Sequence, residues 1–178
     1  MIGFDNYKVE AIKIDTRPIY KSDVDSAWFA AWRAGKTLPG INADWNKKIA
    51  ERVAAGARHL RIKLVDPSNE LAFEVQRCTA ETLWLDQIAV GTEYYFMMRD
   101  DFYKLVAETF PCGWMPHDFW LFDHGAGGIE QFYNDDFSYA RADAISPNDI
   151  PKYIALRDAV MSSDKLFSFD DFKERYLT

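Results

Sequence analysis

The chain has 178 residues, of which 48% are hydrophobic and 16% are aromatic. That length and composition suit one well-buried core and are short for two, so we expect a single domain over residues 1–178. No stretch reaches the roughly 18 apolar residues of a membrane span, and the first residues lack the basic start and apolar run of a signal peptide. We therefore expect a soluble, cytoplasmic protein that does not contact a membrane.

Charge is distributed unevenly along the chain. The net charge is -7, but residues 1–65 hold 12 Lys or Arg against 7 Asp or Glu, and residues 66–178 hold 9 against 21. The two parts therefore carry +5 and -12. An acidic surface repels phosphates, so we expect no direct nucleic-acid binding. DNA contact through the first two predicted helices is a weaker alternative, because their link exceeds the roughly three or four residues of a helix-turn-helix.

The first third of the chain predicts helices. Alternation over residues 7–14 is typical of an edge strand or an extended arm. Ser22 predicts the cap of a helix that ends at Gly35, and a second helix fits residues 44–56. The turn between them is too short for a domain linker. We expect residues 1–57 to form a helical lead-in with an amino-terminal arm.

Residues 58–145 predict the sheet. A strand over residues 59–65 places Leu60, Ile62 and Leu64 on one face and Arg61 and Lys63 on the other. A long helix and another strand follow, and this βαβ unit makes the two strands parallel with a right-handed crossover. A short helix leads to an antiparallel meander. The ranges of these later elements are 70–89, 93–99, 100–110, 118–123, 127–134 and 138–145.

Residues 146–178 close the chain with two predicted helices, over residues 147–161 and 169–177. The whole pattern predicts an α/β or α+β domain. We expect a mixed sheet of about five strands, with the βαβ unit followed by the antiparallel meander and helices on its flanks.

The stretch HDFWLFDH, from His117 to His124, places a histidine beside an aspartate at each end of an aromatic centre. On a strand, neighbouring side chains point to opposite faces, so each histidine is separated from its neighbouring aspartate. A site would need a residue from elsewhere, such as His59 beside His117, or Glu74 beside Asp123. We favour a scaffold role, with Asp123 forming an Asx-type turn.

Sequence motifs for other chemistries are absent. No GxSxG elbow, Walker loop, HExxH or EF-hand loop occurs, and HGAGG precedes a predicted strand, so it lacks the helix N-terminus of a phosphate cradle. Cys78 and Cys112 have no CxxC spacing and suggest neither a disulfide nor a zinc site. We expect no metal and no cofactor.

Four features form one pattern along the chain: AAWRAG, the basic strand RIKLV, a helix that follows Ser68 and contains Phe-Glu, and the strand DFWLFD. The pattern resembles a family of uncharacterised actinobacterial domains, whose most specific element is a DFWLFDD-like strand. Members are often encoded beside helix-turn-helix regulators, so the resemblance implies a role near transcriptional control. The positions that match the family are Trp45, Arg61, Ser68, Glu74, Asp118, Trp120 and Asp123.

The βαβ unit with its meander also resembles half of a phospholipase D-type domain. That family uses a histidine, a lysine two residues later and an aspartate seven residues after the histidine. With Asp123 as the aspartate, Pro116 and Asp118 stand where the histidine and lysine belong. The resemblance therefore implies a non-catalytic relative.

The leading hypothesis is a non-enzymatic regulatory or interaction domain that acts through a protein partner, with a helix-turn-helix regulator as the candidate. For Arg61 and Lys63 we favour an ion pair with Glu74 across the crossover. The oligomeric state stays open. The candidate ligand-binding or partner-binding residues are Trp45, Arg61, Lys63, Ser68, Glu74, Arg99, Asp118, Trp120 and Asp123.

The alternative is a hydrolase or phosphodiesterase with its site at the carboxyl ends of the parallel strands, where open α/β sheets place ligands. Basic side chains and a capping serine would hold an anion there, and an aspartate would act as the base. The residues at these ends are Lys63, Asp66, Ser68, Arg99 and Asp100.

Overall fold

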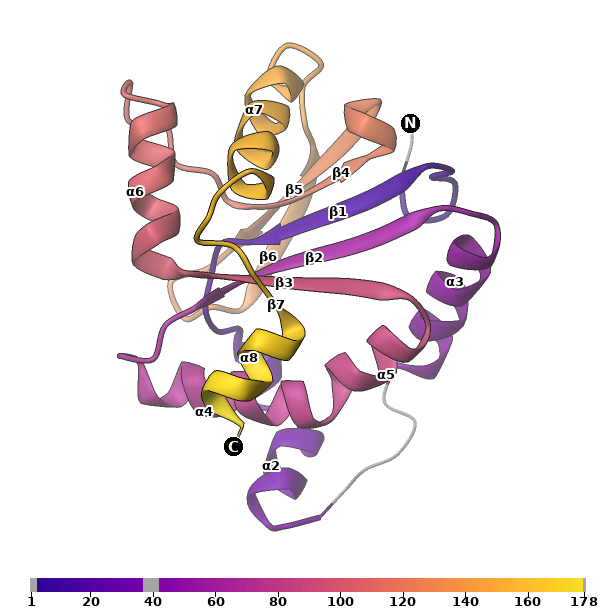
Figure 1. The fold of residues 1–178 in the computed structure, drawn as a ribbon, viewed down its shortest axis with the longest axis vertical. Helices are drawn as coiled ribbons and strands as arrows, with labels where there is room; N and C mark the ends of the chain where they lie inside the picture. The colour runs from indigo at the N-terminus through magenta and orange to yellow at the C-terminus, as the bar shows by residue number, and fades with distance from the viewer. Residues whose placement is uncertain (1–2, 37–41, 178) are drawn as a thin grey trace.

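The computed structural model describes residues 3–36 and 42–177 and shows an α+β domain around a mixed sheet (Figure 1). The sheet has seven strands in the order β6-β5-β4-β1-β2-β3-β7. The strands are β1 (Glu10–Asp15), β2 (Arg58–Val65), β3 (Thr92–Met98), β4 (Asp118–Phe122), β5 (Gly127–Tyr133), β6 (Tyr139–Ala144) and β7 (Phe167–Ser168). The α-helices are α1 (Lys21–Val24), α2 (Ala27–Arg33), α3 (Ala43–Ala54), α4 (Glu70–Glu81), α5 (Leu83–Ala89), α6 (Arg99–Thr109), α7 (Ile150–Met161) and α8 (Phe169–Tyr176).

The prediction of an edge strand or arm over residues 7–14 was wrong, because β1 lies in the middle of the sheet. It pairs parallel with β2 and antiparallel with β4. All six of its residues are buried, including Glu10, Lys13 and Asp15. The alternation of apolar and charged residues in β1 therefore reflects two different buried faces. With β1 and the two-residue β7, the sheet has seven strands where about five were expected.

The predicted βαβ unit is confirmed, since β2 and β3 are parallel neighbours joined through α4 and α5. Asn69 caps α4 by accepting a hydrogen bond from the Ala72 amide at 3.0 Å. The prediction of a single helix over residues 70–89 was wrong, because the chain bends at Thr82, whose φ and ψ are -129° and -84°. The Thr82 hydroxyl donates to the Cys78 carbonyl at 2.7 Å, a bond that competes with the helical ladder.

The antiparallel meander β4-β5-β6 is also confirmed. In the lead-in, the expected helix capped by Ser22 is instead two short helices, and Ser26 caps the second by accepting from the Phe29 amide at 3.2 Å. α3 lies where a second helix was expected, and most of the turn before it falls outside the described residues. No helix in the described ranges is long and apolar enough to cross a membrane.

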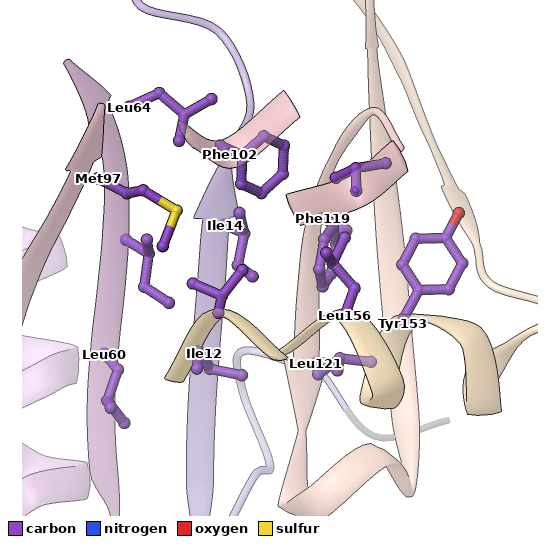
Figure 2. Packing of buried hydrophobic residues seen from close by; sticks show 13 residues of the cluster. Ile12, Ile14, Leu60, Leu64, Met97, Phe102, Phe119, Leu121, Tyr153 and Leu156 are labelled. Carbon is purple, nitrogen blue, oxygen red and sulfur yellow. The ribbon is translucent and has the colours of Figure 1, made fainter. Parts of the chain in front are cut away.

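One face of the sheet is mostly apolar and is covered by α6 and α7. Its strands contribute alternate residues of β1, β2 and β4, and α6 and α7 contribute Phe102 and Leu156. Figure 2 shows these side chains in one layer. The buried members from the strands include Ile12, Ile14, Leu60, Ile62, Leu64, Met97, Phe119 and Leu121.

The opposite face carries aromatic and charged side chains and is covered by the other helices. Trp84 of α5 and Phe172 of α8 pack on β3, and Trp45 of α3 packs beside Trp120 of β4. Figure 1 shows α2, α3, α4 and α5 gathered apart from α6 and α7. Between these aromatic groups lies a charged cluster on the two central strands.

Candidate functional site

The charged cluster is built by the alternation of β1 and β2. Lys13 lies beside Arg61 and Asp15 lies beside Lys63 in the parallel register, so the four side chains share one face. Asp15 is completely buried, and the side chains of Lys13 and Lys63 are only 8% and 11% exposed. Such residue types are rarely buried unless they are paired.

Asp15 is the acceptor that joins the three cations. Its Oδ1 lies 2.5 Å from Lys13 Nζ, and its Oδ2 lies 2.9 Å from Arg61 Nη2 and 3.0 Å from Lys63 Nζ. The expected ion pair of Arg61 or Lys63 with Glu74 was therefore wrong. Glu74 instead forms a surface ion pair with Arg33.

The pKa values of this cluster follow from burial and from mutual attraction. Burial raises the pKa of Asp15, but Arg61, Lys13 and Lys63 outweigh it and hold the pKa well below its ordinary value of 3.8. Burial lowers the pKa of Lys63, and this effect outweighs the attraction of Asp15. Asp15 therefore stays ionised, whereas Lys63 holds its proton less firmly than a surface lysine.

A second buried carboxyl group, Asp118 of β4, lies next to the cluster. Its Oδ1 accepts from the Thr16 amide and hydroxyl, each at 2.8 Å, and its Oδ2 bonds the Tyr20 hydroxyl. Tyr20 Oη also lies 3.0 Å from Asp15 Oδ1, and a phenol has one proton to share between two carboxylates. Burial raises the pKa of Asp118, so Asp118 takes up a proton before Asp15 does.

Aromatic rings surround the three cations. Lys63 Nζ lies 5.2 Å from the Tyr20 ring centroid and 5.9 Å from that of Trp84, and the Arg61 guanidinium lies 5.9 Å from that of Tyr94. Trp84 and Tyr94 are stacked with their centroids 5.4 Å apart. Both the charges and the flat apolar surfaces therefore face one space.

That space is a cavity of about 290 Å³, which we call the face pocket. Arg61 Nε is buried beside it and has no hydrogen-bond partner among the described residues. Burial raises the pKa of Asp23, which lies at the wall, above the ordinary value for a carboxyl group. The lining residues are Lys13, Tyr20, Ser22, Asp23, Asn42, Arg61, Lys63, Thr79, Leu83, Trp84, Gln87, Tyr94, Tyr133 and Tyr139.

The residues predicted for a site at the carboxyl ends of the parallel strands do not all converge. Lys63 points into the face pocket, and the side chain of Asp100 is 94% exposed. Asp66 does meet Arg99 Nη1 at 2.6 Å and accepts from the Ser68 hydroxyl at 2.5 Å. This carboxylate is fully engaged in a turn and an ion pair, so it is not a free base.

The aromatic centre of the stretch from His117 to His124 is buried and packs on both faces of the sheet. Phe119 and Leu121 join the apolar face, and Trp120 packs on the other face. The prediction that Asp123 forms an Asx-type turn was wrong. Its carboxylate accepts instead from the amides of residues 8, 9 and 10, at distances from 2.7 to 3.2 Å, and so fastens the start of β1.

The proposed partners of these residues do not meet. His59 bonds Tyr7 through Nδ1 at 3.1 Å and packs against Trp45 and Trp120. His117 is exposed, and its ring lies against Phe132. Within residues 3–36 and 42–177, no group of three or more His, Cys, Asp or Glu could hold a metal.

Of the nine predicted candidates, Arg61 and Lys63 line the face pocket and Asp118 lies next to its cluster. Trp120 lies 5.8 Å from Lys13 Nζ, whereas Trp45, Ser68, Glu74, Arg99 and Asp123 serve other contacts. Sequence reasoning missed the rest of the site. The charged residues of β1 were the available indication, because a hydrophobic alternation with charges fits a central strand as well as an edge. The missed residues are Lys13, Asp15, Tyr20, Asp23, Trp84, Tyr94 and Tyr133.

Comparison with known proteins identifies a family. A family model described as a domain of unknown function, DUF6879, matches residues 3–165. The match covers β1 to α7 and ends before β7 and α8. No curated protein and no solved structure matches the chain. The family description therefore gives no activity, and a function has to be inferred from the geometry of this chain.

Proposed function

Because the chain belongs to the DUF6879 family of domains of unknown function, we propose its function from its own site: it binds a small anionic ligand in the face pocket. The observation that carries this proposal is the set of three cations, Lys13, Arg61 and Lys63, held together in a largely buried aromatic cavity. Burying charges is costly, and apolar residues of similar size would often be neutral or more stable at such positions. A binding role explains why the cations are there.

The charges favour an anion. Of the three described carboxyl groups of this cluster, Asp15 has a lowered pKa, whereas burial raises the pKa values of Asp118 and Asp23. Positive charge is therefore left over whenever either of those two groups is protonated. A phosphate or carboxylate group would supply acceptors for the N–H donors of Lys63 and Arg61 that Asp15 does not use.

The shape of the pocket limits the size of the ligand. A cavity of about 290 Å³ lies at the small end of ligand sites, so it suits a single ring with its anionic group. Trp84 and Tyr94 offer flat faces for that ring, and Gln87 Oε1, which bonds Tyr94 Oη at 2.5 Å, adds a polar edge. We propose an aryl phosphate, an aryl carboxylate or a mononucleotide as the class of ligand.

The proposal extends to the role of the domain. We propose a cytoplasmic, non-enzymatic regulatory domain of actinobacterial type that acts through a protein partner, with a helix-turn-helix regulator as the candidate. The resemblance of the DFWLFD strand and the acidic carboxyl-terminal part support it. A distant, non-catalytic relation to phospholipase D-type domains is part of the same proposal. It is supported by the βαβ unit and meander, and by the absence of that family's histidine and lysine from their places in the sequence.

A hydrolase at the carboxyl ends of the strands is the second proposal, and it has less support. A hollow does lie there, with Arg99 in its wall. The base that it needs is not free, because Asp66 is held by Arg99 and Ser68. Loss of hydrolysis of an aryl phosphate in Asp66→Asn, with hydrolysis retained in Lys63→Met, would favour it over the face pocket.

Isothermal titration calorimetry tests the leading proposal. The probes are inorganic phosphate, phenyl phosphate, benzoate and a nucleoside monophosphate, with benzylamine, which is protonated at neutral pH, as a cationic counterpart. We expect the ring-bearing anions to bind and benzylamine not to bind. Failure of all four anions to bind, at ligand concentrations up to 10 mM, would contradict the proposal.

Matched variants place the binding. Lys63→Met and Arg61→Met should each weaken binding of the aryl anion by about tenfold or more, since one charge-assisted hydrogen bond contributes about 1.5–3 kcal/mol. Arg141→Met is the control, because Arg141 is an exposed cation of β6 that does not line the pocket. Equal losses in all three variants would indicate general charge attraction rather than a site.

A further inference from the structure

Two hollows adjoin beyond the carboxyl ends of β1, β2 and β3. The first has a volume of about 330 Å³, and its walls include Arg17, Arg99 and His117. The second has a volume of about 290 Å³, and both are lined by Phe137. We call the two hollows together the end groove. In the described part of the chain, no Asp or Glu lines the first hollow.

The arginines of the end groove have hydrogen-bond donors to spare. The Arg17 guanidinium lies 5.5 Å from the ring centroids of Tyr133 and Phe137, and it forms no ion pair with any described residue. Arg99 bonds Asp66 through Nη1, and its buried Nε has no hydrogen-bond partner among the described residues but lies 3.8 Å from Asp100 Oδ1. A guanidinium has five N–H donors, so both side chains can still bind a carboxylate.

Apolar side chains gather at the same place. Six large hydrophobic side chains are exposed among the described residues, and three of them, Leu71, Met115 and Phe137, line the end groove. They are 40%, 51% and 39% exposed. Exposed apolar residues that cluster beside polar ones mark interaction surfaces, whereas single ones need no explanation.

We propose that the end groove docks a short acidic and apolar segment of a protein partner. Carboxylates of the segment would pair with Arg17 and Arg99 in the first hollow, and an apolar side chain would pack on Leu71 and Phe137 in the second. The match between an acidic segment and the arginines is confined to the groove, since residues 66–178 as a whole carry a net charge of -12. A nucleic acid would extend its charge beyond the groove and meet this acidic surface, whereas a short segment stays within the groove.

This inference rests on the proposal of a protein partner and is independent of the ligand of the face pocket. Lys63, which is central to the face pocket, does not line the end groove. Lys63→Met should therefore leave the docking unchanged. Loss of ligand binding and loss of docking can be measured separately.

Selection from a displayed library of random 12-residue peptides tests the proposal on the full chain. We expect the enriched peptides to contain Asp or Glu near Leu, Phe or Met. A synthetic copy of the strongest one should bind in fluorescence anisotropy, and more weakly in 500 mM NaCl, because salt screens exposed charges. No enrichment, or enrichment of sequences without acidic residues, would overturn the proposal.

Three variants place the peptide in the groove. Arg17→Gln removes a cation that has no ion pair with the described residues, Leu71→Gln changes an exposed residue, and Phe137→Asn suits the φ of 63° at that position. Each substitution should weaken binding of the peptide by about tenfold, which corresponds to about 1.4 kcal/mol. Arg141→Gln and Leu85→Gln are the matched controls, since both residues are exposed and lie outside the groove.

Two outcomes contradict the assignment. Equal binding to the groove variants and to the controls would place the peptide elsewhere. Displacement of the peptide by a single-stranded oligonucleotide at physiological salt would show that the groove takes a polyanion and not a protein segment. Circular dichroism and thermal unfolding of each variant show that a loss of binding is not a loss of fold.

Discussion

The two faces of the central strands differ in composition, although alternating residues of the same strands form both. On one face, Ile12, Ile62 and Phe119 pack under α6 and α7 in a mostly apolar layer. On the other face, Lys13 and Arg61 alternate with these residues and surround Asp15. The apolar face stabilises the fold, and the charged face holds groups that are costly to bury. This difference supports the proposal that the second face binds a ligand.

Removal of the central carboxylate should have the largest effect. Asp15→Asn leaves Lys13, Arg61 and Lys63 close together without their shared counterion. Breaking a buried ion pair from one side typically costs about 3–5 kcal/mol. Urea unfolding checks this, and added phosphate should restore part of the loss by taking the place of the carboxylate. A loss below about 1 kcal/mol would contradict the account of Asp15.

The apolar face should respond to truncation in a different way. Phe119→Ala removes a fully buried ring between the sheet and Tyr153, and such changes cost about 3–5 kcal/mol. The loss should be the same with and without phosphate, because no charge changes. Urea unfolding in both buffers measures it. Rescue of Phe119→Ala by phosphate would remove the distinction between the two faces.

Protonation should destabilise the aromatic side of the charged face. Burial lowers the pKa of His59 from 6.5 to about 3, and nearby Arg61 adds to the shift. Below pH 6.5 the unfolded chain binds a proton at His59 that the folded chain does not, so stability falls as the pH falls toward about 3. The slope from this group is about 1.4 kcal/mol per pH unit.

Urea unfolding at pH 7 and pH 5 measures that slope. The variant His59→Gln keeps a polar group beside Tyr7 and lacks the titration. The wild-type chain should lose more stability than the variant between the two pH values. Equal losses would show that His59 does not titrate differently in the folded and unfolded chains.

Part of this arrangement could be predicted from the sequence. The alternation of Leu60, Ile62 and Leu64 predicted both the strand and the face that these residues share, and the HGAG and DD turns separated the strands of the meander. The face of Arg61 and Lys63 was predicted too. Their acceptor was not, because Glu74 is near in the βαβ unit whereas Asp15 lies 46 residues from Arg61.

The rest of the site depends on contacts that no local pattern specifies. Lys13 comes from β1, Arg61 from β2, Tyr94 from β3, Trp84 from α5 and Tyr133 from β5. These residues come together because of the order of the strands, in which β1 lies at the centre of the sheet. Once β1 is taken for an edge, Lys13 and Asp15 resemble ordinary surface charges, and the pocket cannot be found.

The smallest effect on stability is also the most informative about function. Lys63→Met removes one of three cations and leaves Asp15 paired with Lys13 and Arg61. Because the buried lysine is costly and methionine packs well, we expect stability to stay the same or to rise by about 1 kcal/mol. A loss of several kcal/mol would show that Lys63 serves the fold.

The most direct test compares the urea midpoints of the wild-type chain and Lys63→Met with and without phenyl phosphate, at constant ionic strength. A ligand present at ten times its Kd stabilises the folded state by about 1.4 kcal/mol. We predict that increase for the wild-type chain and little or none for Lys63→Met at the same concentration. Equal responses of the two proteins, or no response of the wild-type chain, would contradict the claim that the face pocket binds an anion.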